Sequence, residues 1–247
     1  MNDHELAARL ATRAGDLLLD VRAEFADAPA ADRKAAGDKR SHEFLMAELA
    51  AQRPGDSVLS EEATADQRAD PARLSAERVW IVDPLDGTRE FSELGRDDWA
   101  VHVALWSAGE LVAGAVALPA QNTTLSTPEV AAPRPFDGAP RVVVSRTRPP
   151  TVALAVRDAL AGTLVEMGSA GAKVAAVVRG VADVYVHAGG QYEWDSAAPV
   201  AVARAAGLHT SRIDGSPLLY NRADPLLPDL VVCRPALAER VLAVTAQ

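Results

Sequence analysis

Apolar residues recur every three or four positions near the start of the chain, a spacing that places them on one face of a helix. The residues of this stripe are Leu6, Leu10, Ala14, Leu17, Leu18, Val21 and Phe25. Asp3 is the expected N-cap, and the Ala- and Pro-rich residues 26–36 are expected to end the helix. A second helix is expected over residues 41–52, with Ser41 as its cap.

Short apolar runs follow, and their lengths are typical of strands. We expect strands at residues 58–59, 79–82, 99–106, 111–118 and 123–126. The run at 79–82 is continuously apolar, which indicates a buried strand. The two longest runs are joined by the polar residues 107–110, and this arrangement predicts a β-hairpin. Residues 63–76 are polar and alanine-rich, which is typical of a surface loop with some helix.

Strand and helix patterns alternate after residue 140, and this order predicts an α/β layer. The expected strands are 141–145, 164–167, 181–186 and 230–233, and the expected helices are 152–160, 172–178, 196–206 and 235–244. A Pro-rich stretch at 128–140 precedes the alternation and is the best candidate for a boundary. We therefore predict an N-terminal α+β part, residues 1–138, and a C-terminal α/β part, residues 139–247.

The composition is that of an ordinary globular chain, with 49% apolar and 24% charged residues among 247. Cys233 is the only cysteine, so the chain has no internal disulfide and no Cys-based zinc cluster, which fits a reducing compartment. No apolar run approaches the ~20 residues of a membrane span, and the first residues lack the pattern of a secretory signal. The cytoplasm is the expected location, without a membrane partner.

The net charge of −9 and the aromatic content of 4% disfavour binding to a nucleic-acid polymer. An acidic chain repels a polyanionic duplex, and few aromatic rings are present to stack on bases. A small anionic ligand is compatible with this charge, because bound metal ions reverse the local sign of the field. We therefore look for carboxylates arranged to hold metal ions.

Carboxylates lie at the ends of predicted elements in three places: Glu61-Glu62, Asp83 with Asp86, and Asp195. Asp83 and Asp86 follow a buried strand and share one tight turn, where they repel each other unless a cation lies between them. Mg²⁺ is the natural candidate, because it prefers oxygen ligands and keeps waters that a phosphate displaces. Taken singly, the turn with Asp83 and Asp86 is equally compatible with an ordinary capped turn, Glu61-Glu62 is more typical of a solvated turn, and Asp195 is more typical of a helix N-cap.

The three segments together resemble the inositol monophosphatase family of metal-dependent, lithium-sensitive phosphatases. The central motif is Trp80-Ile-Val-Asp-Pro-Leu-Asp-Gly-Thr-Arg-Glu-Phe91, with Leu59-Ser-Glu-Glu62 upstream and Glu193-Trp-Asp-Ser-Ala-Ala198 downstream. The Arg-Glu-Phe ending and the strand Val142-Val-Val-Ser-Arg146 are similar to the CysQ branch. The resemblance covers nearly the whole chain, and the enzymes of that branch are 3′-phosphoadenosine 5′-phosphate (PAP) phosphatases.

The resemblance implies a layered α-β-α-β-α sandwich of the inositol monophosphatase and fructose-1,6-bisphosphatase type. It implies two or three Mg²⁺ ions per site and Li⁺ as an inhibitor. The implied metal ligands are Glu61, Asp83, the carbonyl of Leu85, Asp86 and Asp195, most of them in the N-terminal part. The implied substrate-binding residues are Leu85, Asp86, Gly87, Thr88, Ser145, Arg146, Gly168, Ser169, Lys173 and Asp195. The amides of Gly87 and Thr88 are expected to open a helix and to hold the phosphate.

Two positions depart from the family pattern. The stretch before the second helix lacks the usual threonine, and Asp38 is the best match for the carboxylate that pairs with Thr88. Glu61, Thr88 and Asp38 are accordingly the expected catalytic residues. At position 188, where inositol-preferring members carry a glutamate, this chain has Ala188. That difference disfavours an inositol substrate.

The resulting hypothesis is Mg²⁺-dependent removal of the 3′-phosphate of PAP, which gives AMP. Arg146, and after it Arg89, are the candidates for binding the second phosphate. Two alternatives stay open: a phosphatase for inositol 1-phosphate or fructose 1,6-bisphosphate, and a catalytically silent regulator that binds anions. The partner is a small phosphorylated substrate, and a homodimer is one possible assembly. His102 lies in an apolar run and is expected to be an ordinary residue of the core.

Overall fold

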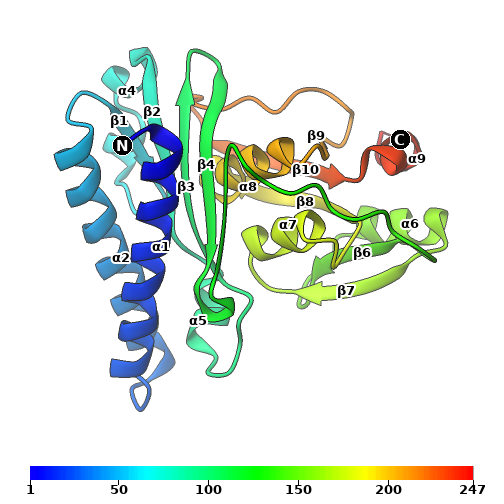
Figure 1. Ribbon diagram of the computed structural model, residues 1–247, viewed down its shortest axis with the longest axis horizontal. Coiled ribbons are helices and arrows are strands. Elements are labelled where there is room, and N and C mark those ends of the chain that lie inside the picture. Colours follow the sequence, from blue (N-terminus) through cyan, green and yellow to red (C-terminus); the bar gives the residue numbers. More distant parts are fainter. Residues whose placement is uncertain (247) are drawn as a thin grey trace.

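The protein is described by a computed structural model that covers residues 1–246 and has five alternating layers of helices and sheets (Figure 1). The helices are α1 (Asp3–Glu24), α2 (Ala30–Gln52), α3 (Ala65–Arg68), α4 (Pro71–Ser75), α5 (Thr88–Ser92), the 3₁₀ turn η1 (Pro119–Gln121), α6 (Thr151–Leu160), α7 (Ala170–Val178), α8 (Glu193–Ala205) and α9 (Pro235–Thr245). The strands are β1 (Ser57–Ser60), β2 (Arg78–Asp86), β3 (Ala100–Ser107), β4 (Glu110–Leu118), β5 (Thr123–Ser126), β6 (Arg141–Ser145), β7 (Thr163–Met167), β8 (Val184–Tyr192), β9 (His209–Ser211) and β10 (Leu226–Cys233). The predicted α-β-α-β-α sandwich is confirmed.

The first sheet contains the strands β1 to β5 in sequence order. β1 and β2 are parallel, and each later neighbour is antiparallel, with β3 and β4 forming the predicted hairpin. Leu105 and the other residues of one face pack against α1 and α2, while Ala104 and its neighbours face α8. The sheet is therefore buried on both sides, which explains the continuous apolar runs of its strands.

The outer helices α1 and α2 differ from the sequence prediction at their starts. Asn2 rather than Asp3 is the N-cap of α1, and it forms a capping box with Glu5. The predicted end of the first helix is confirmed, because α1 stops at Glu24. The extent of the break to residue 36 and the start of the second helix at Ser41 are wrong, because α2 already begins at Ala30, directly after Pro29. The alanines and charged residues that follow are good helix formers, and a proline is tolerated at a helix start.

Two small residues let α2 approach the turn at the end of β2. A Cβ atom on Gly37 would lie 2.7 Å from the Phe91 ring and 2.9 Å from Leu85. Ser41 is fully buried in the helix interior and donates to the carbonyl oxygen of Pro84 at 2.7 Å. The prediction of Ser41 as an N-cap is therefore wrong, and its side chain instead anchors the turn.

The helices α7 and α8 form the middle layer, between the two sheets (Figure 1). The second sheet has the order β7-β6-β8-β10-β9. β7, β6 and β8 are parallel to one another, and β10 is antiparallel to both of its neighbours, β8 and β9. Its far side is covered by α6 and α9, which pack on each other. The largest core cluster combines residues of both sheets with α7 and α8, such as Ile81, Val177, Ala197 and Leu230.

The predicted boundary between residues 138 and 139 lies in the segment that connects β5 to β6. The division into two parts stays a prediction. No helix within residues 1–246 is long and apolar enough to cross a membrane.

A buried aspartate links the ends of β6, β8 and β10, the three central strands of the second sheet. Asp183 is fully buried, and its carboxylate accepts hydrogen bonds from the Arg141 backbone at 2.9 Å and from the side chains of Arg141 and Arg234. Burial alone would raise the pKa of Asp183, but these bonds hold it below its ordinary value. Because the pKa is lower in the folded state, the carboxylate stabilises the fold above its unfolded pKa, and this stabilisation is lost as the pH falls.

We expect Asp183→Asn to lower the free energy of unfolding at pH 7 by about 3 kcal/mol, because it leaves two arginines without a buried countercharge. Urea unfolding measures this change, and the difference from the unsubstituted chain should shrink below about pH 4. Asp158→Asn is the control, since Asp158 pairs with Arg157 at the surface. Equal effects of the two substitutions would contradict this account.

Candidate active site

Three aspartates from distant parts of the sequence converge where the first sheet meets the middle layer. Asp83, Asp86 and Asp195 each present an oxygen atom, and these atoms all lie within 4.8 Å of one another. The first two lie at the end of β2, and the third lies in the first turn of α8. The structure thus brings together three of the carboxylates that the sequence singled out.

The end of β2 is shaped so that both of its aspartates face one point. The pairing of β2 with β3 is regular to Asp83 and resumes, shifted, at Asp86. The backbone N–H of Leu85 donates to Asp83 Oδ1 at 3.0 Å, which closes the turn over the intervening proline. Gly87 then adopts a φ of +83°, where a Cβ atom would lie 2.9 Å from Ser169. A residue with a side chain is therefore disfavoured at this position.

Glu61 is carried to the same place by strand pairing. Ser60 at the end of β1 lies beside Val82 in the parallel ladder, and the Glu61 N–H donates to the Val82 carbonyl at 3.3 Å. Burial raises the pKa of Glu61 to about 7, and the charge of Asp86 contributes to the rise. Its neighbour Glu62 is exposed.

The cluster carries more negative charge than the protein groups around it neutralise. Burial, followed by the charges of Glu61 and Asp86, raises the pKa of Asp83 well above its ordinary value. Asp83 Oδ2 is buried and has no hydrogen-bond partner among residues 1–246. Burial and Asp86 likewise raise the pKa of Asp195 to about 7. A cation that binds here would relieve both the desolvation and the repulsion.

The donor set fits a hard divalent cation such as Mg²⁺. The converging groups are carboxylate oxygens, and the Leu85 carbonyl, which accepts from Thr88 Oγ1 at 3.2 Å, has a second lone pair. Mg²⁺ and Ca²⁺ prefer such oxygen ligands, whereas zinc and copper favour nitrogen and sulfur. The unpartnered Oδ2 atom of Asp83 is a buried acceptor that a cation would satisfy.

Asp86 is held by the first turn of α7. It accepts hydrogen bonds from the Ser169 hydroxyl and from the N–H groups of Gly171 at 2.6 Å and Ala170 at 3.2 Å. Burial alone would raise its pKa, but His102 and these donors lower the pKa of Asp86 to about 2. Asp86 is therefore ionised at neutral pH, whereas burial and nearby carboxylates raise the pKa values of Glu61, Asp83 and Asp195.

Asp195 also has one oxygen fixed by the backbone. α8 begins at Glu193 rather than at the predicted Ser196, so Asp195 lies inside the first turn. Its Oδ2 atom accepts from the N–H of Tyr192 at 2.7 Å. This bond restrains the side chain while it faces Asp83 and Asp86.

Thr88 and Asp38 lie side by side, as the resemblance implied. Thr88 Oγ1 is 3.5 Å from Asp38 Oδ1, and it also donates to the carbonyl of Leu85. Because α2 begins early, Asp38 sits within the helix and faces α5 rather than lying in a solvated turn. Burial, with the charge of Glu62, raises the pKa of Asp38 to about 6.

Comparison with known proteins identifies this arrangement. The model of the inositol monophosphatase family matches residues 4–132 and 137–247. The chain belongs to this family. Its match includes every residue of the carboxylate cluster, together with Thr88 and Asp38.

Several relatives with curated names match nearly the whole chain. The 3′-phosphoadenosine 5′-phosphate phosphatase of Mycobacterium leprae is 52% identical, covering 99% of this chain and 93% of its own. The 3′(2′),5′-bisphosphate nucleotidase CysQ of Escherichia coli is 31% identical over 89% of this chain and 94% of its own. These family members are named as phosphatases or nucleotidases, which are enzymes.

Solved structures agree with the fold. CysQ from Bacteroides thetaiotaomicron superimposes with a TM-score of 0.75 at 28% identity, over 93% of this chain and 96% of that one. Inositol monophosphatase II from Staphylococcus aureus superimposes with a TM-score of 0.79 over 100% of this chain and 96% of that one. At 18% identity, the second likeness concerns the fold alone.

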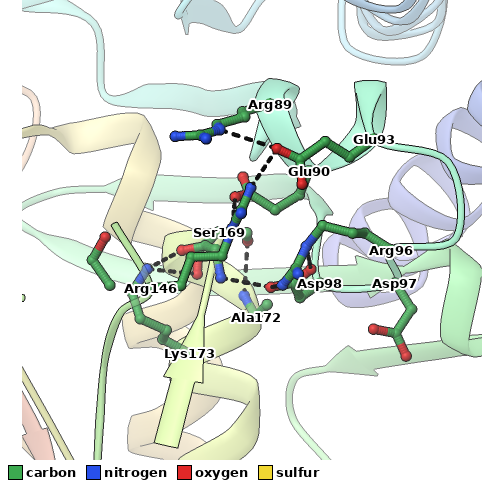
Figure 2. Close-up of polar contacts among 12 residues, drawn as sticks. Arg89, Glu90, Glu93, Arg96, Asp97, Asp98, Arg146, Ser169, Ala172 and Lys173 are labelled. Carbon is green, nitrogen blue, oxygen red and sulfur yellow. Dashed lines mark hydrogen bonds and ion pairs between the residues drawn. The ribbon is translucent and has the colours of Figure 1, made fainter. Parts of the chain in front are cut away.

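Charged residues hold the predicted substrate loop around Gly168 and Ser169 in place, among them Lys173 and Asp98 (Figure 2). The buried Lys173 donates to the carbonyl oxygens of both loop residues. Asp98 accepts from the Gly168 N–H at 2.6 Å and pairs with Arg96. Lys173 therefore supports the loop from within, whereas a basic group near the substrate was expected from the sequence.

The other predicted substrate residues lie at the end of β6. The Ser145 hydroxyl accepts from the Arg148 N–H at 3.3 Å. Arg146 donates to Glu90 at 2.8 Å and to Glu93 at 2.7 Å, and Glu93 also accepts from Arg89 at 3.1 Å (Figure 2). Both candidate arginines for the second phosphate thus share the carboxylate of Glu93.

His102 is the main residue at this site whose place the sequence analysis missed. It is fully buried, as expected, but its Nε2 atom lies 3.2 Å from Asp86 Oδ2. The expectation of an ordinary core histidine is therefore incomplete. A signal was present, since a single polar residue interrupts the apolar run of β3, but the register with Asp83 was needed to interpret it.

We expect Asp83→Asn to raise the melting temperature of the metal-free protein by about 4 °C, because it removes one charge from a repelling cluster. The same substitution should abolish the rise in melting temperature caused by Mg²⁺, and with it the catalytic activity. Thermal unfolding with and without Mg²⁺ measures both effects. Asp97→Asn, an exposed carboxylate nearby, should leave the Mg²⁺ effect intact. A normal response to Mg²⁺ in Asp83→Asn would contradict the assigned ligand.

Proposed function

We propose that this chain hydrolyses the 3′-phosphate of PAP to give AMP and inorganic phosphate, using Mg²⁺. The observation that supports the chemistry is the convergence of Asp83, Asp86 and Asp195, with a buried acceptor lacking a partner. The substrate is supported by the relatives, because the M. leprae enzyme named for PAP is 52% identical over 99% of this chain.

In this proposal Glu61, Asp83, Asp86, Asp195 and the carbonyl of Leu85 hold two or three Mg²⁺ ions. When bound, Mg²⁺ lowers the pKa of water and neutralises charge on phosphate oxygens. The turn at the end of β2 supplies most of these ligands from one rigid segment, fixed by the bonds from Leu85 and Ser41. Li⁺ inhibition is a further expectation of the proposal.

Thr88 and Asp38 orient the attacking water. While the Thr88 hydroxyl donates to Asp38 or to the Leu85 carbonyl, its oxygen is free to accept from water. The water oxygen forms a bond to phosphorus as the bond to the ribose 3′-oxygen breaks. The water proton passes toward Asp38 or Glu61, and the 3′-oxygen takes a proton from solvent. One acid–base group of this kind contributes about 10²–10⁴-fold to the rate.

The scissile phosphate is held by the amides of Gly87 and Thr88. Gly87 lacks a side chain and adopts a positive φ, which brings its backbone close to Ser169 across the site. The first N–H groups of a helix have no intrahelical partner and are available to an anion. Gly168 and Ser169 complete the phosphate site in this proposal.

The second phosphate of PAP is bound by Arg146 with Arg89. Their guanidinium groups converge on one carboxylate oxygen of Glu93, which marks a point where two cations face an oxyanion. A phosphate at this point forms charge-assisted hydrogen bonds of the same kind. Glu93 is 38% exposed in its side chain and is displaced toward solvent in this proposal.

The inositol and sugar-phosphate alternatives are less well supported. Position 188 on β8 carries alanine, so it offers no carboxylate to the hydroxyl groups of inositol. The silent regulator finds no support, because the carboxylate cluster is intact and the named relatives are enzymes. The cytoplasmic location and a homodimeric assembly stay predictions.

We expect Thr88→Ala to lower kcat by about 10²-fold while KM changes by less than about threefold, since orientation of water matters mainly in the transition state. Steady-state kinetics with PAP at saturating Mg²⁺ separates the two constants. Thr88→Ser, which keeps the hydroxyl, is the control and should retain most of kcat. An unchanged kcat in Thr88→Ala would contradict this role and leave Thr88 only as the first residue of α5.

We expect kcat/KM for PAP to exceed that for inositol 1-phosphate and for fructose 1,6-bisphosphate by at least about tenfold, which is ~1.4 kcal/mol of transition-state binding. Phosphate release from a substrate panel measures the ratio. Adenosine 3′-monophosphate belongs in the panel, because it lacks the second phosphate and should also be poorer. Equal or reversed ratios would move the chain to the inositol or sugar-phosphate alternative.

A further inference from the structure

The side chain of His102 lies at the junction of all the elements that carry the carboxylate cluster. His102 is directly opposite Asp83 in the antiparallel ladder of β2 and β3, so the two side chains leave the same face of the sheet. Its ring is fully buried, and Nδ1 is 4.0 Å from Asp83 Oδ2. Sheet register alone therefore brings the ring to the acidic cluster.

The two ring nitrogens contact different elements. Nδ1 lies 3.0 Å from the carbonyl oxygen of Trp194, and because a carbonyl only accepts, Nδ1 is the donor. Nε2 lies 3.2 Å from Asp86 Oδ2 at the end of β2. Trp194 directly precedes Asp195 in the first turn of α8. The imidazole thus spans the gap between Asp86 and the backbone that carries Asp195.

The first turn of α7 is adapted to this ring. A Cβ atom on Gly171 would collide with Nε2 and the carbons of the His102 ring, so the close approach requires glycine. The N–H of Gly171 donates to the same Oδ2 atom of Asp86 that Nε2 faces. Lys173, the buried lysine of α7, donates to the carbonyls of Gly168 and Ser169 and supports the loop instead.

We propose that His102 is a positioning residue, which fixes the separation between Asp86 and Asp195 through the ion-pair contact of Nε2 with Asp86 and the hydrogen bond of Nδ1 to the Trp194 carbonyl. The proposal rests on the metal-dependent function above but not on the identity of the substrate. Asp86 and Asp195 lie on separate elements and repel each other, so a rigid group between them is needed to hold the distance that two ligands of one cation require. Mutation of a residue that hydrogen-bonds to a metal ligand typically weakens metal affinity by about 10–100-fold.

The test is the affinity of the substrate-free protein for Mn²⁺, measured by calorimetry. We expect His102→Ala to raise the Kd for Mn²⁺ by about 10–100-fold. His102→Asn retains an amide near Nδ1, which can donate to Trp194, and His102→Gln places an amide near Nε2, which can reach Asp86. Each keeps one arm of the bridge, and each should lie between the unsubstituted chain and His102→Ala. If His102→Ala fails to fold, the Kd values of His102→Asn and His102→Gln for Mn²⁺ test the proposal instead.

Val103→Ala is the matched control, because Val103 is the next residue of β3, is equally buried, and faces α1 on the opposite side of the sheet. It should lower the melting temperature while leaving the Kd for Mn²⁺ unchanged. The proposal is overturned if His102→Ala binds Mn²⁺ within twofold of the unsubstituted chain, or if Val103→Ala weakens binding equally. It is also overturned if His102→Asn alone restores full affinity, since the contact with Asp86 would then be dispensable. Because no substrate is present, a failure of the PAP assignment leaves these outcomes interpretable.

Discussion

The mutual repulsion of buried carboxylates is the constraint around which this molecule is organised. Burial raises the pKa values of Glu61, Asp83 and Asp195, and the charge of Asp86 adds to the rise of each, while the pKa of Asp86 itself is lowered. The difference arises from donors, since Asp86 receives the first N–H groups of α7 and faces His102. The protein thus compensates one charge of the cluster and leaves the remainder to a ligand. A site that solvates all of its own carboxylates would have little affinity for a cation.

The proposed substrate site follows the opposite arrangement, because its arginines are already paired with carboxylates. Arg146 lies between Glu90 and Glu93, and Arg96 is paired with Asp98 (Figure 2). These pairs keep Gly168 in place, since Glu90 packs against it and Asp98 accepts its N–H. A phosphate that binds Arg146 must therefore compete with a carboxylate, and only a ligand of comparable charge does so effectively. In the proposed function, this favours a substrate that places a second phosphate at Arg146 over one that places only hydroxyl groups there.

Much of this architecture could be predicted from the sequence, because the signals were local. Apolar runs located the strands of both sheets, and the turn motif located Asp83 and Asp86. The start of α2 was mispredicted, since Pro29 was taken as part of a break when it precedes a helix. β9 was missed because His209–Ser211 is three residues long and has no apolar run. The contacts of His102 and Glu90 depend on strand register and on packing between layers, and neither is encoded in residue spacing.

The placement of α7 and α8 between the two sheets also has a consequence for how the molecule forms. Asp83 and Asp86 precede the connection between the sheets, whereas Asp195 follows it, and the donors that fix Asp86 come from α7. More than 100 residues separate Asp86 from Asp195, so their contact is non-local and forms at the entropic cost of closing a long loop. Neither half of the chain contains a complete cation site by itself. An incompletely folded or truncated chain therefore carries the acidic turn of β2 without Asp195 and the donors of α7. In the proposed function, cation binding would then report that both sheets have closed on the helices between them.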